Sequence, residues 1–187
     1  MIHSVRFTAV LDTNVIYPLV SRDILLWFAH CDLYTPKWSE TIFEEWKRVM
    51  IRNGTTAEEA AKRITFPNSA FPDALVRNYD GLIASLTLPD KDDCHVLAAA
   101  IKANANVIVT NNQKDFPEAY LRSFGIKAKT ADDFLTDLID LNEQQAVAAF
   151  RKMVLNKRNP PLNEYEVLNQ LRNAGLTDTA NYLHSQI

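Results

Sequence analysis

The chain has 187 residues, of which 47% are hydrophobic and 23% are charged, and its formal net charge is −3. This length suits one domain with a small appendage, and the apolar residues suffice for a sizeable core. The charge excludes a protein that binds nucleic acid through a strongly basic overall composition, although an acidic site can mask a local basic face. No apolar run approaches the ~20 residues of a membrane span, and the first residues do not resemble a signal peptide. We therefore expect a cytoplasmic protein without membrane contact.

Predicted strands and helices alternate in the first part of the chain. Residues 7–11 are predicted to form a buried strand that ends at Asp12, and residues 33–36 a second strand ended by a proline. Helices are predicted over 21–29 and 39–50. Asp12 thus lies at the carboxyl end of a strand, where an aspartate either caps the next helix or contributes to a site.

The helix predicted over 39–50 is amphipathic, and one glutamate lies beside its apolar face. The apolar residues recur at helical spacing: Ile42, Phe43, Trp46, Val49 and Met50. Glu45 precedes Trp46, about 100° around the helix. A glutamate in this place usually forms a surface salt bridge, and a role at the edge of the sheet is the alternative.

Acidic residues stand at both ends of the segment 89–117. Three aspartates precede an apolar helix: Asp90, Asp92 and Asp93. A short β-branched strand follows over 107–109, and the polar turn after it reaches Asp115. Acidic groups therefore occur where a helix begins and where a strand ends.

The remaining segments complete an α/β pattern. A helix is predicted over 55–64, short helices over 66–88, and a strand over 126–129 whose alternating lysines mark a sheet edge. The chain then becomes helical: 118–124 before that strand, and 131–141, 143–155, 163–173 and 177–186 after it. These alternations predict a parallel sheet with helices on both faces. We expect one domain over residues 1–135 and a helical extension over 136–187.

Four carboxylates can converge at one edge of this sheet if the predicted strands are adjacent: Asp12, Glu45, Asp93 and Asp115. Such a group raises its own pKa values unless a cation compensates the charge. Mg²⁺ or Mn²⁺ suits this donor set, because each takes a few carboxylate oxygens and keeps several waters. A site of this kind can activate water for attack on a phosphodiester.

Other cofactor chemistry finds little support in the sequence. The histidines show no zinc-ligand spacing: His3, His30, His95 and His184. His95 is expected to have a packing or surface role. There is no GxGxxG or Walker-type loop, which disfavours dinucleotide binding and NTP hydrolysis.

Four segments together resemble a known family. FTAVLDTNV, FEEWKRV, PDKDDCHVLAAAI and VIVTNNQKDFP, in this order and at these separations, resemble the PIN-domain ribonucleases, in particular their VapC-type toxin branch. The resemblance covers roughly residues 5–135. It implies a PIN-like α/β/α fold of three layers, with a central parallel sheet of four to five strands and, here, a helical C-terminal extension.

The resemblance also implies an activity and a set of site residues. Asp12, Glu45, Asp93 and Asp115 match the carboxylates that bind Mg²⁺ or Mn²⁺ and hydrolyse RNA. Many PIN domains have T-x-D-x-x-D after the last core strand, and here Asn112 replaces the first of these aspartates. The smaller polar residues expected to orient ligands or water are Thr13, Asn14, Thr110 and Asn112.

Partners follow from the same resemblance. A VapC-type toxin implies an RNA substrate, a small antitoxin protein and a homodimer. The residues expected to contact RNA phosphates are Lys47, Arg48, Arg52 and Lys114, with a solvated helix face as the alternative. Two other functions stay open: a non-catalytic PIN-fold module that binds RNA or protein, and a PIN-like nuclease that acts on DNA.

Overall fold

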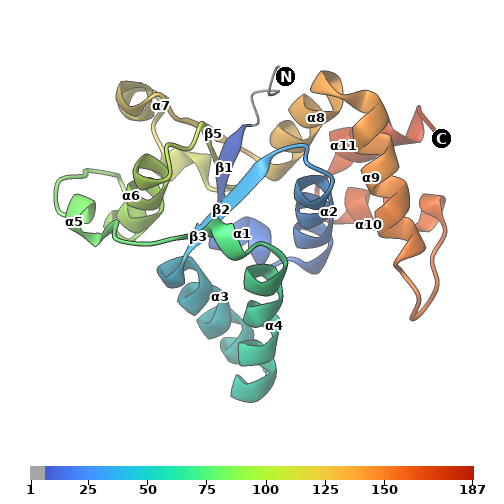
Figure 1. Ribbon diagram of the computed structural model, residues 1–187, viewed down its shortest axis with the longest axis horizontal. Coiled ribbons are helices and arrows are strands. Elements are labelled where there is room, and N and C mark those ends of the chain that lie inside the picture. Colours follow the sequence, from blue (N-terminus) through green and yellow to red (C-terminus); the bar gives the residue numbers. More distant parts are fainter. Residues whose placement is uncertain (1–6) are drawn as a thin grey trace.

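A computed structural model describes residues 7–187, and a five-stranded parallel sheet lies at its centre (Figure 1). The strands are β1 (Thr8–Leu11), β2 (Thr35–Ser39), β3 (Leu75–Val76), β4 (Val107–Val109) and β5 (Lys127–Lys129). Their order in the sheet is β3-β2-β1-β4-β5. The prediction of a parallel sheet of four to five strands is confirmed, as is the place of the Lys127–Lys129 strand at its edge.

The strand order reverses beside β1. From β1 the chain moves outward to β2 and β3, and it then returns to the other side of β1 with β4 and β5. β1 and β4 are paired in register, with Leu11 opposite Val109. In an open parallel sheet, the carboxyl ends at such a reversal border a crevice where sites form. The residues after Leu11 and Val109 occupy this place.

Helices cover both faces of the sheet, as the sequence predicts (Figure 1). On one face lies α6 (Cys94–Lys102), which packs against β1, β2 and β4. On the other lie α2 (Leu19–His30) and α8 (Ala131–Leu141). Short elements complete this part: α1 (Thr13–Ile16), η1 (Pro72–Ala74), α5 (Asp80–Ile83), η2 (Lys91–Asp93), η3 (Gln113–Asp115), α7 (Glu118–Leu121) and η4 (Arg122–Phe124).

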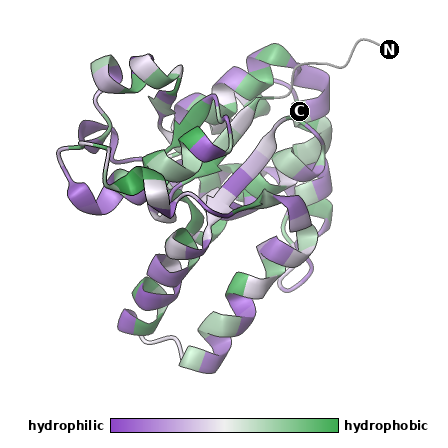
Figure 2. Ribbon diagram, turned by 60° about the vertical axis from the view of Figure 1, so that its left-hand side comes forward, coloured by the Kyte–Doolittle hydropathy of each residue, from purple (hydrophilic) through white to green (hydrophobic). Residues whose placement is uncertain are grey.

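Helices α3 (Glu40–Arg52) and α4 (Ala57–Ala70) project from the body as a pair (Figures 1 and 2). The prediction that the second of them ends at residue 64 is wrong, because α4 continues through Pro67 to Ala70. A proline inside a helix costs about 3 kcal/mol. Tertiary contacts offset this cost: Pro67 is buried, and the indole of Trp38 donates a 2.8 Å hydrogen bond to Asn68.

The second strand lies further along the chain than predicted. β2 begins at Thr35 and continues beyond Pro36 to Ser39. β3 pairs only with Trp38 and Ser39, so no neighbouring strand needs a donor from Pro36 on that side. β3 itself lies within residues 66–88, where only helices were predicted. Its two residues are too few to give a strand pattern.

The C-terminal helices are α9 (Glu143–Leu155), α10 (Glu164–Asn173) and α11 (Thr177–His184). They pack on α2 and α8, outside one face of the sheet (Figure 1). Their apolar residues belong to the same hydrophobic core as those of the sheet, for example Phe150 and Leu183. The extension therefore packs onto the α2 and α8 side of the sheet and shares its hydrophobic core. The 135/136 boundary falls within the continuous helix α8 and stays a prediction.

Among residues 7–187, no helix combines the length and the apolar character that a bilayer crossing requires.

Asp132, in the first turn of α8, caps the N-terminus of α11. Its carboxylate accepts hydrogen bonds from the backbone N–H groups of Asp178 (3.0 Å) and Thr179 (2.8 Å) and from the Thr179 hydroxyl (2.6 Å). Asp132→Ala should lower the free energy of unfolding by about 1–3 kcal/mol, because Thr179 is fully buried and its donors lose their acceptor. Urea denaturation measures this. The exposed Asp92→Ala is the control, and an equal loss in both variants would contradict the capping role.

Candidate active site

Asp12 lies at the carboxyl edge of the sheet, between β1 and β4. It follows Leu11 directly, and its backbone N–H donates a 3.1 Å hydrogen bond to the carbonyl of Val109. The residue is only 5% exposed. The sheet therefore holds this carboxylate in the crevice that the strand order predicts.

Three neighbours fix the orientation of the Asp12 side chain. Oδ1 accepts a 2.7 Å bond from the backbone N–H of Thr13, while Oδ2 accepts bonds from Asn14 Nδ2 (2.6 Å) and the Thr110 hydroxyl (2.8 Å). Burial raises the pKa of the Asp12 carboxyl, and the bonds from Thr110 and Thr13 offset this only in part. All three neighbours are residues that the sequence suggested for orienting ligands.

Glu45 reaches the same edge from α3. Its Oε2 accepts a 2.7 Å hydrogen bond from the Thr13 hydroxyl, and its Oε1 lies 2.8 Å from His95 Nε2. Burial alone would raise the pKa of Glu45, but the hydrogen bonds from His95 and Thr13 outweigh it and lower the pKa. These contacts correspond to the second of the two roles considered for Glu45, a place at the edge of the sheet.

Asp93 lies where η2 leads into α6, and one oxygen of its carboxylate has no partner among residues 7–187. Its Oδ2 is buried and has no hydrogen-bond partner among the described residues. Burial raises the pKa of Asp93 to about 7, with further contributions from the charges of Asp12, Asp90 and Asp115. An orphaned buried oxygen among carboxylates fits a site that holds a cation.

The raised pKa of Asp93 predicts how the stability of the metal-free protein depends on pH. The folded state binds a proton near pH 7, whereas the unfolded carboxyl binds it only near its usual pKa of about 4. Stability should therefore fall as the pH rises from about 4 to 7, and Asp93→Asn should remove this part of the dependence. Thermal denaturation of both proteins in EDTA at several pH values measures it. Parallel pH profiles would contradict the assignment.

Asp115 ends η3 on the other side of the site. The side-chain amide of Asn112 donates a hydrogen bond to its Oδ2, and the backbone N–H of Asn112 donates a 3.1 Å bond to the Thr110 hydroxyl. Asn112 thus positions Asp115 and connects it to the Thr110 hydroxyl, which itself bonds to Asp12.

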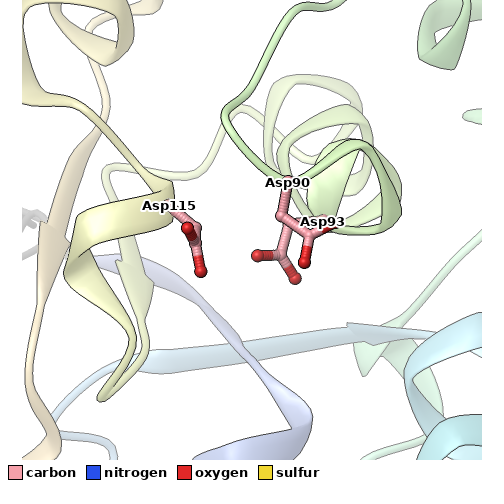
Figure 3. Close-up of side chains that lie close together, drawn as sticks. All are labelled: Asp90, Asp93 and Asp115. Carbon is pink, nitrogen blue, oxygen red and sulfur yellow. The ribbon is translucent and has the colours of Figure 1, made fainter.

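Asp90 lies beside these carboxylates, although it is not one of the four predicted from the sequence. Asp90, Asp93 and Asp115 each present a ligand oxygen, and these oxygens lie within 4.8 Å of one another. Asp90 and Asp93 come from the η2 turn just before α6, and Asp115 faces them from η3 (Figure 3). The run Asp90–Asp93 contained the signal, but its spacing alone does not distinguish a ligand from a helix cap.

His95 contacts one of the predicted site carboxylates, whereas only a packing or surface role was expected for it. It is 7% exposed, its Nε2 contacts Glu45, and its Nδ1 has no partner among the described residues. Sequence spacing could not identify this contact, because Glu45 lies 50 residues away.

The basic residues suggested for RNA contact are not all free to bind it. Lys47 lies 4.0 Å from Glu44, while Arg48, Arg52 and Lys114 are exposed. The positive charge of Arg48 also acts on Glu45. Arg48 therefore lies near one of the carboxylates. RNA contact by these four residues stays a prediction.

A separate apolar cavity of about 470 Å³ lies between β5 and α8. Its lining includes Phe7, Phe134, Leu138 and Leu141. The carboxylates described above are not part of this lining: Asp12, Glu45, Asp90, Asp93 and Asp115. Phe7 precedes β1, so this cavity lies at the amino end of that strand, opposite Asp12. It does not contribute to the site.

The donor set has a clear chemical preference. It consists of carboxylates from separate elements, with an amide and hydroxyls behind them and no paired thiols. Hard divalent cations such as Mg²⁺ and Mn²⁺ take oxygen ligands of this kind, and a cation held here can acidify water and neutralise a phosphate oxygen. The arrangement can therefore support hydrolysis of a phosphodiester.

Comparison with known proteins agrees with the fold and with the helical extension. A family model described as PIN domain matches residues 8–114, and one described as VapC50 C-terminal domain matches residues 131–185. The "Putative ribonuclease VapC50" of Mycobacterium tuberculosis (strain H37Rv) is 42% identical over 98 residues, which are 52% of this chain and 57% of that protein. The chain thus matches little more than half the length of this relative. No solved structure gives a significant match. Since the first model spans more than half of the chain, the protein belongs to the PIN-domain family.

Proposed function

We propose that the protein is a metal-dependent endoribonuclease that acts as the toxin of a toxin–antitoxin pair. The observation that carries the proposal is the convergence of Asp12, Glu45, Asp93 and Asp115 at the carboxyl edge of the sheet. Membership of the PIN family supports it, as does similarity to a protein whose name describes a ribonuclease.

The proposed mechanism gives each carboxylate a role. Asp12, Glu45 and Asp93 would hold Mg²⁺ or Mn²⁺, directly or through water, and Asp115 would orient water or complete the ligand set. The bound ion would supply Lewis-acid chemistry for in-line attack on the phosphodiester. Asp12 is already fixed by Thr13, Asn14 and Thr110, so little reorganisation accompanies the reaction.

RNA would approach through its phosphates. Arg48, Arg52 and Lys114 are exposed and can neutralise them, and Lys47 can join if it leaves Glu44. Such contacts position the strand without reading its sequence. We therefore expect the rate of cleavage at subsaturating RNA to fall as salt increases.

The direct test is a cleavage assay with the purified protein. Labelled RNA and DNA of the same sequence are incubated with Mg²⁺, with Mn²⁺, or with EDTA. RNA cleavage that requires the metal supports the proposal. Cleavage of DNA alone would favour a DNA nuclease, and RNA cleavage that continues in EDTA would contradict metal dependence.

A non-catalytic module is the second candidate, and one observation favours it. Asn112 carries no charge, and its amide is engaged with Asp115, which lowers the negative charge available to a cation. Calorimetric titration with Mn²⁺ distinguishes the two functions. Absence of binding at millimolar Mn²⁺, together with absence of cleavage, would favour the module.

The partners are proposed with the function. A small antitoxin would hold the protein inactive, and two copies would form a homodimer. Toxicity on expression, relieved by co-expression of the protein encoded by a neighbouring short reading frame, tests the first. Light scattering of the purified protein tests the second.

His95 should matter as a positioning residue for Glu45. His95→Ala removes the group 2.8 Å from Glu45 Oε1, and we expect Mn²⁺ affinity to fall about 10- to 100-fold, the usual effect of losing a partner of a metal ligand. His95→Gln retains a donor and should recover part of the loss. A purely packing role would lower the melting temperature of His95→Ala and leave Mn²⁺ affinity unchanged.

A further inference from the structure

We propose that Arg22 is a positioning residue, which fixes Glu45 relative to Asp12 by holding α1 against α3. This inference rests on the proposed function and extends it to a cationic residue outside the acidic group. Arg22 is half-buried in α2, and it belongs to none of the four segments that resemble the PIN family.

The guanidinium of Arg22 holds the C-terminal end of α1. Its Nη1 donates hydrogen bonds to the carbonyls of Ile16 (2.8 Å) and Tyr17 (3.1 Å). The last carbonyls of a helix have no partner within that helix, so a charged donor from another element stabilises them. Helix α1 has only four residues and begins directly after Asp12. Arg22 therefore restricts the short segment that leads away from Asp12.

The same guanidinium contacts α3 beside Glu45. Its Cζ lies 4.9 Å from the centroid of the Trp46 ring, which is within the range of a cation–π contact. Trp46 follows Glu45 directly and is 1% exposed. Such a contact is stronger where water is excluded. Arg22 therefore connects the end of α1 to the residue next to Glu45.

The contact of α1 with α3 at the site itself depends on one hydroxyl group. The Thr13 hydroxyl lies 2.7 Å from Glu45 Oε2 and 3.3 Å from the carbonyl of Ile42. A hydroxyl has a single proton to donate, so these two acceptors share it. One shared contact fixes the angle between two helices only weakly. The contact between Arg22 and Trp46 adds a second point of attachment.

Another contact between these segments is exposed to solvent. Asn53 Nδ2 donates a 2.8 Å hydrogen bond to the Tyr17 hydroxyl. Water can replace an exposed bond at little cost, whereas the half-buried guanidinium of Arg22 has no such ready substitute. We therefore expect loss of Arg22 to loosen α1 from α3. Glu45 would then lie less precisely against Asp12, and a cation between them would be held less tightly.

Mn²⁺ titration of the full chain by calorimetry tests the effect on the site. Arg22→Gln removes the charge and the planar group over Trp46, and Mn²⁺ affinity should fall about 3- to 30-fold. Arg22→Lys keeps a cation that can bond to the α1 carbonyls, and it should recover part of the loss. Arg63→Gln is the matched control, because Arg63 is exposed in α4 and its charge acts on Arg22. This control should bind Mn²⁺ as the unaltered protein does.

Nuclear magnetic resonance of the metal-free proteins separates positioning from a general loss of stability. In Arg22→Gln, the backbone amide signals of Thr13 and Glu45 should shift or broaden, while that of Val96 in α6 should stay in place. Unchanged Thr13 and Glu45 signals would overturn the inference, as would changes of equal size at Val96. Mn²⁺ affinity that is unchanged in Arg22→Gln, or equally reduced in Arg63→Gln, would also overturn it. These results would leave the proposed function intact, whereas absence of Mn²⁺ binding in the unaltered protein would overturn both.

Discussion

Asp12→Asn should reduce metal-dependent RNA cleavage by a factor on the order of 10³ or more, which corresponds to about 4 kcal/mol of transition-state stabilisation. The substitution keeps the size of the side chain and removes its charge. It also replaces one of the two oxygens that accept hydrogen bonds from Thr13, Asn14 and Thr110 with an N–H donor. Both changes weaken the hold on a cation at the centre of the site.

The measurement is the single-turnover cleavage rate at saturating Mn²⁺, compared with that of the unaltered protein. Asp80→Asn is the control, because Asp80 is exposed in α5 and lies outside the acidic group. The melting temperature of Asp12→Asn shows whether the fold is kept. A folded variant with cleavage within tenfold of the original would contradict the role of Asp12.

Local pattern is enough to place two of the proposed site residues in the fold, while their role in the site stays a prediction. Asp12 follows a buried β-branched strand, and Asp93 precedes an apolar helix, so simple periodicity places both at the same edge of a parallel sheet. The helical extension was also predictable, because Thr130, Asn142 and Asn163 cap its helices through their side chains.

Other features depend on contacts between distant segments. Pattern alone left Glu45 between a salt bridge and a site, and its bonds to Thr13 and His95 come from residues 32 and 50 positions away. β2 can include Pro36 because β3 pairs only with Trp38 and Ser39, and this pairing cannot be read from the local sequence. Asp90 resembles a cap in the sequence, and only the approach of Asp115 from η3 shows that it lies in an acidic cluster.

Phe150→Ala should lower the free energy of unfolding by about 3–5 kcal/mol, a large part of the total stability of a domain. Phe150 lies in α9, is fully buried and belongs to the same hydrophobic core as the sheet. Its loss leaves a cavity that the surrounding helices can fill only in part. Leu155→Ala in the same helix is the control and should change little, because Leu155 is 75% exposed.

The optical signal makes this variant a test of how the extension is joined to the PIN domain. The three tryptophans are Trp27, Trp38 and Trp46, all far from α9 in sequence, so fluorescence reports on α2, β2 and α3. Because α9 packs on α2 in one continuous core, Phe150→Ala should shift the fluorescence and circular dichroism transitions in urea together. A fluorescence transition that stays in place while the helical signal is lost earlier would show that the extension unfolds by itself. The extension would then be an attached unit, and the single core seen here would not act as one cooperative structure.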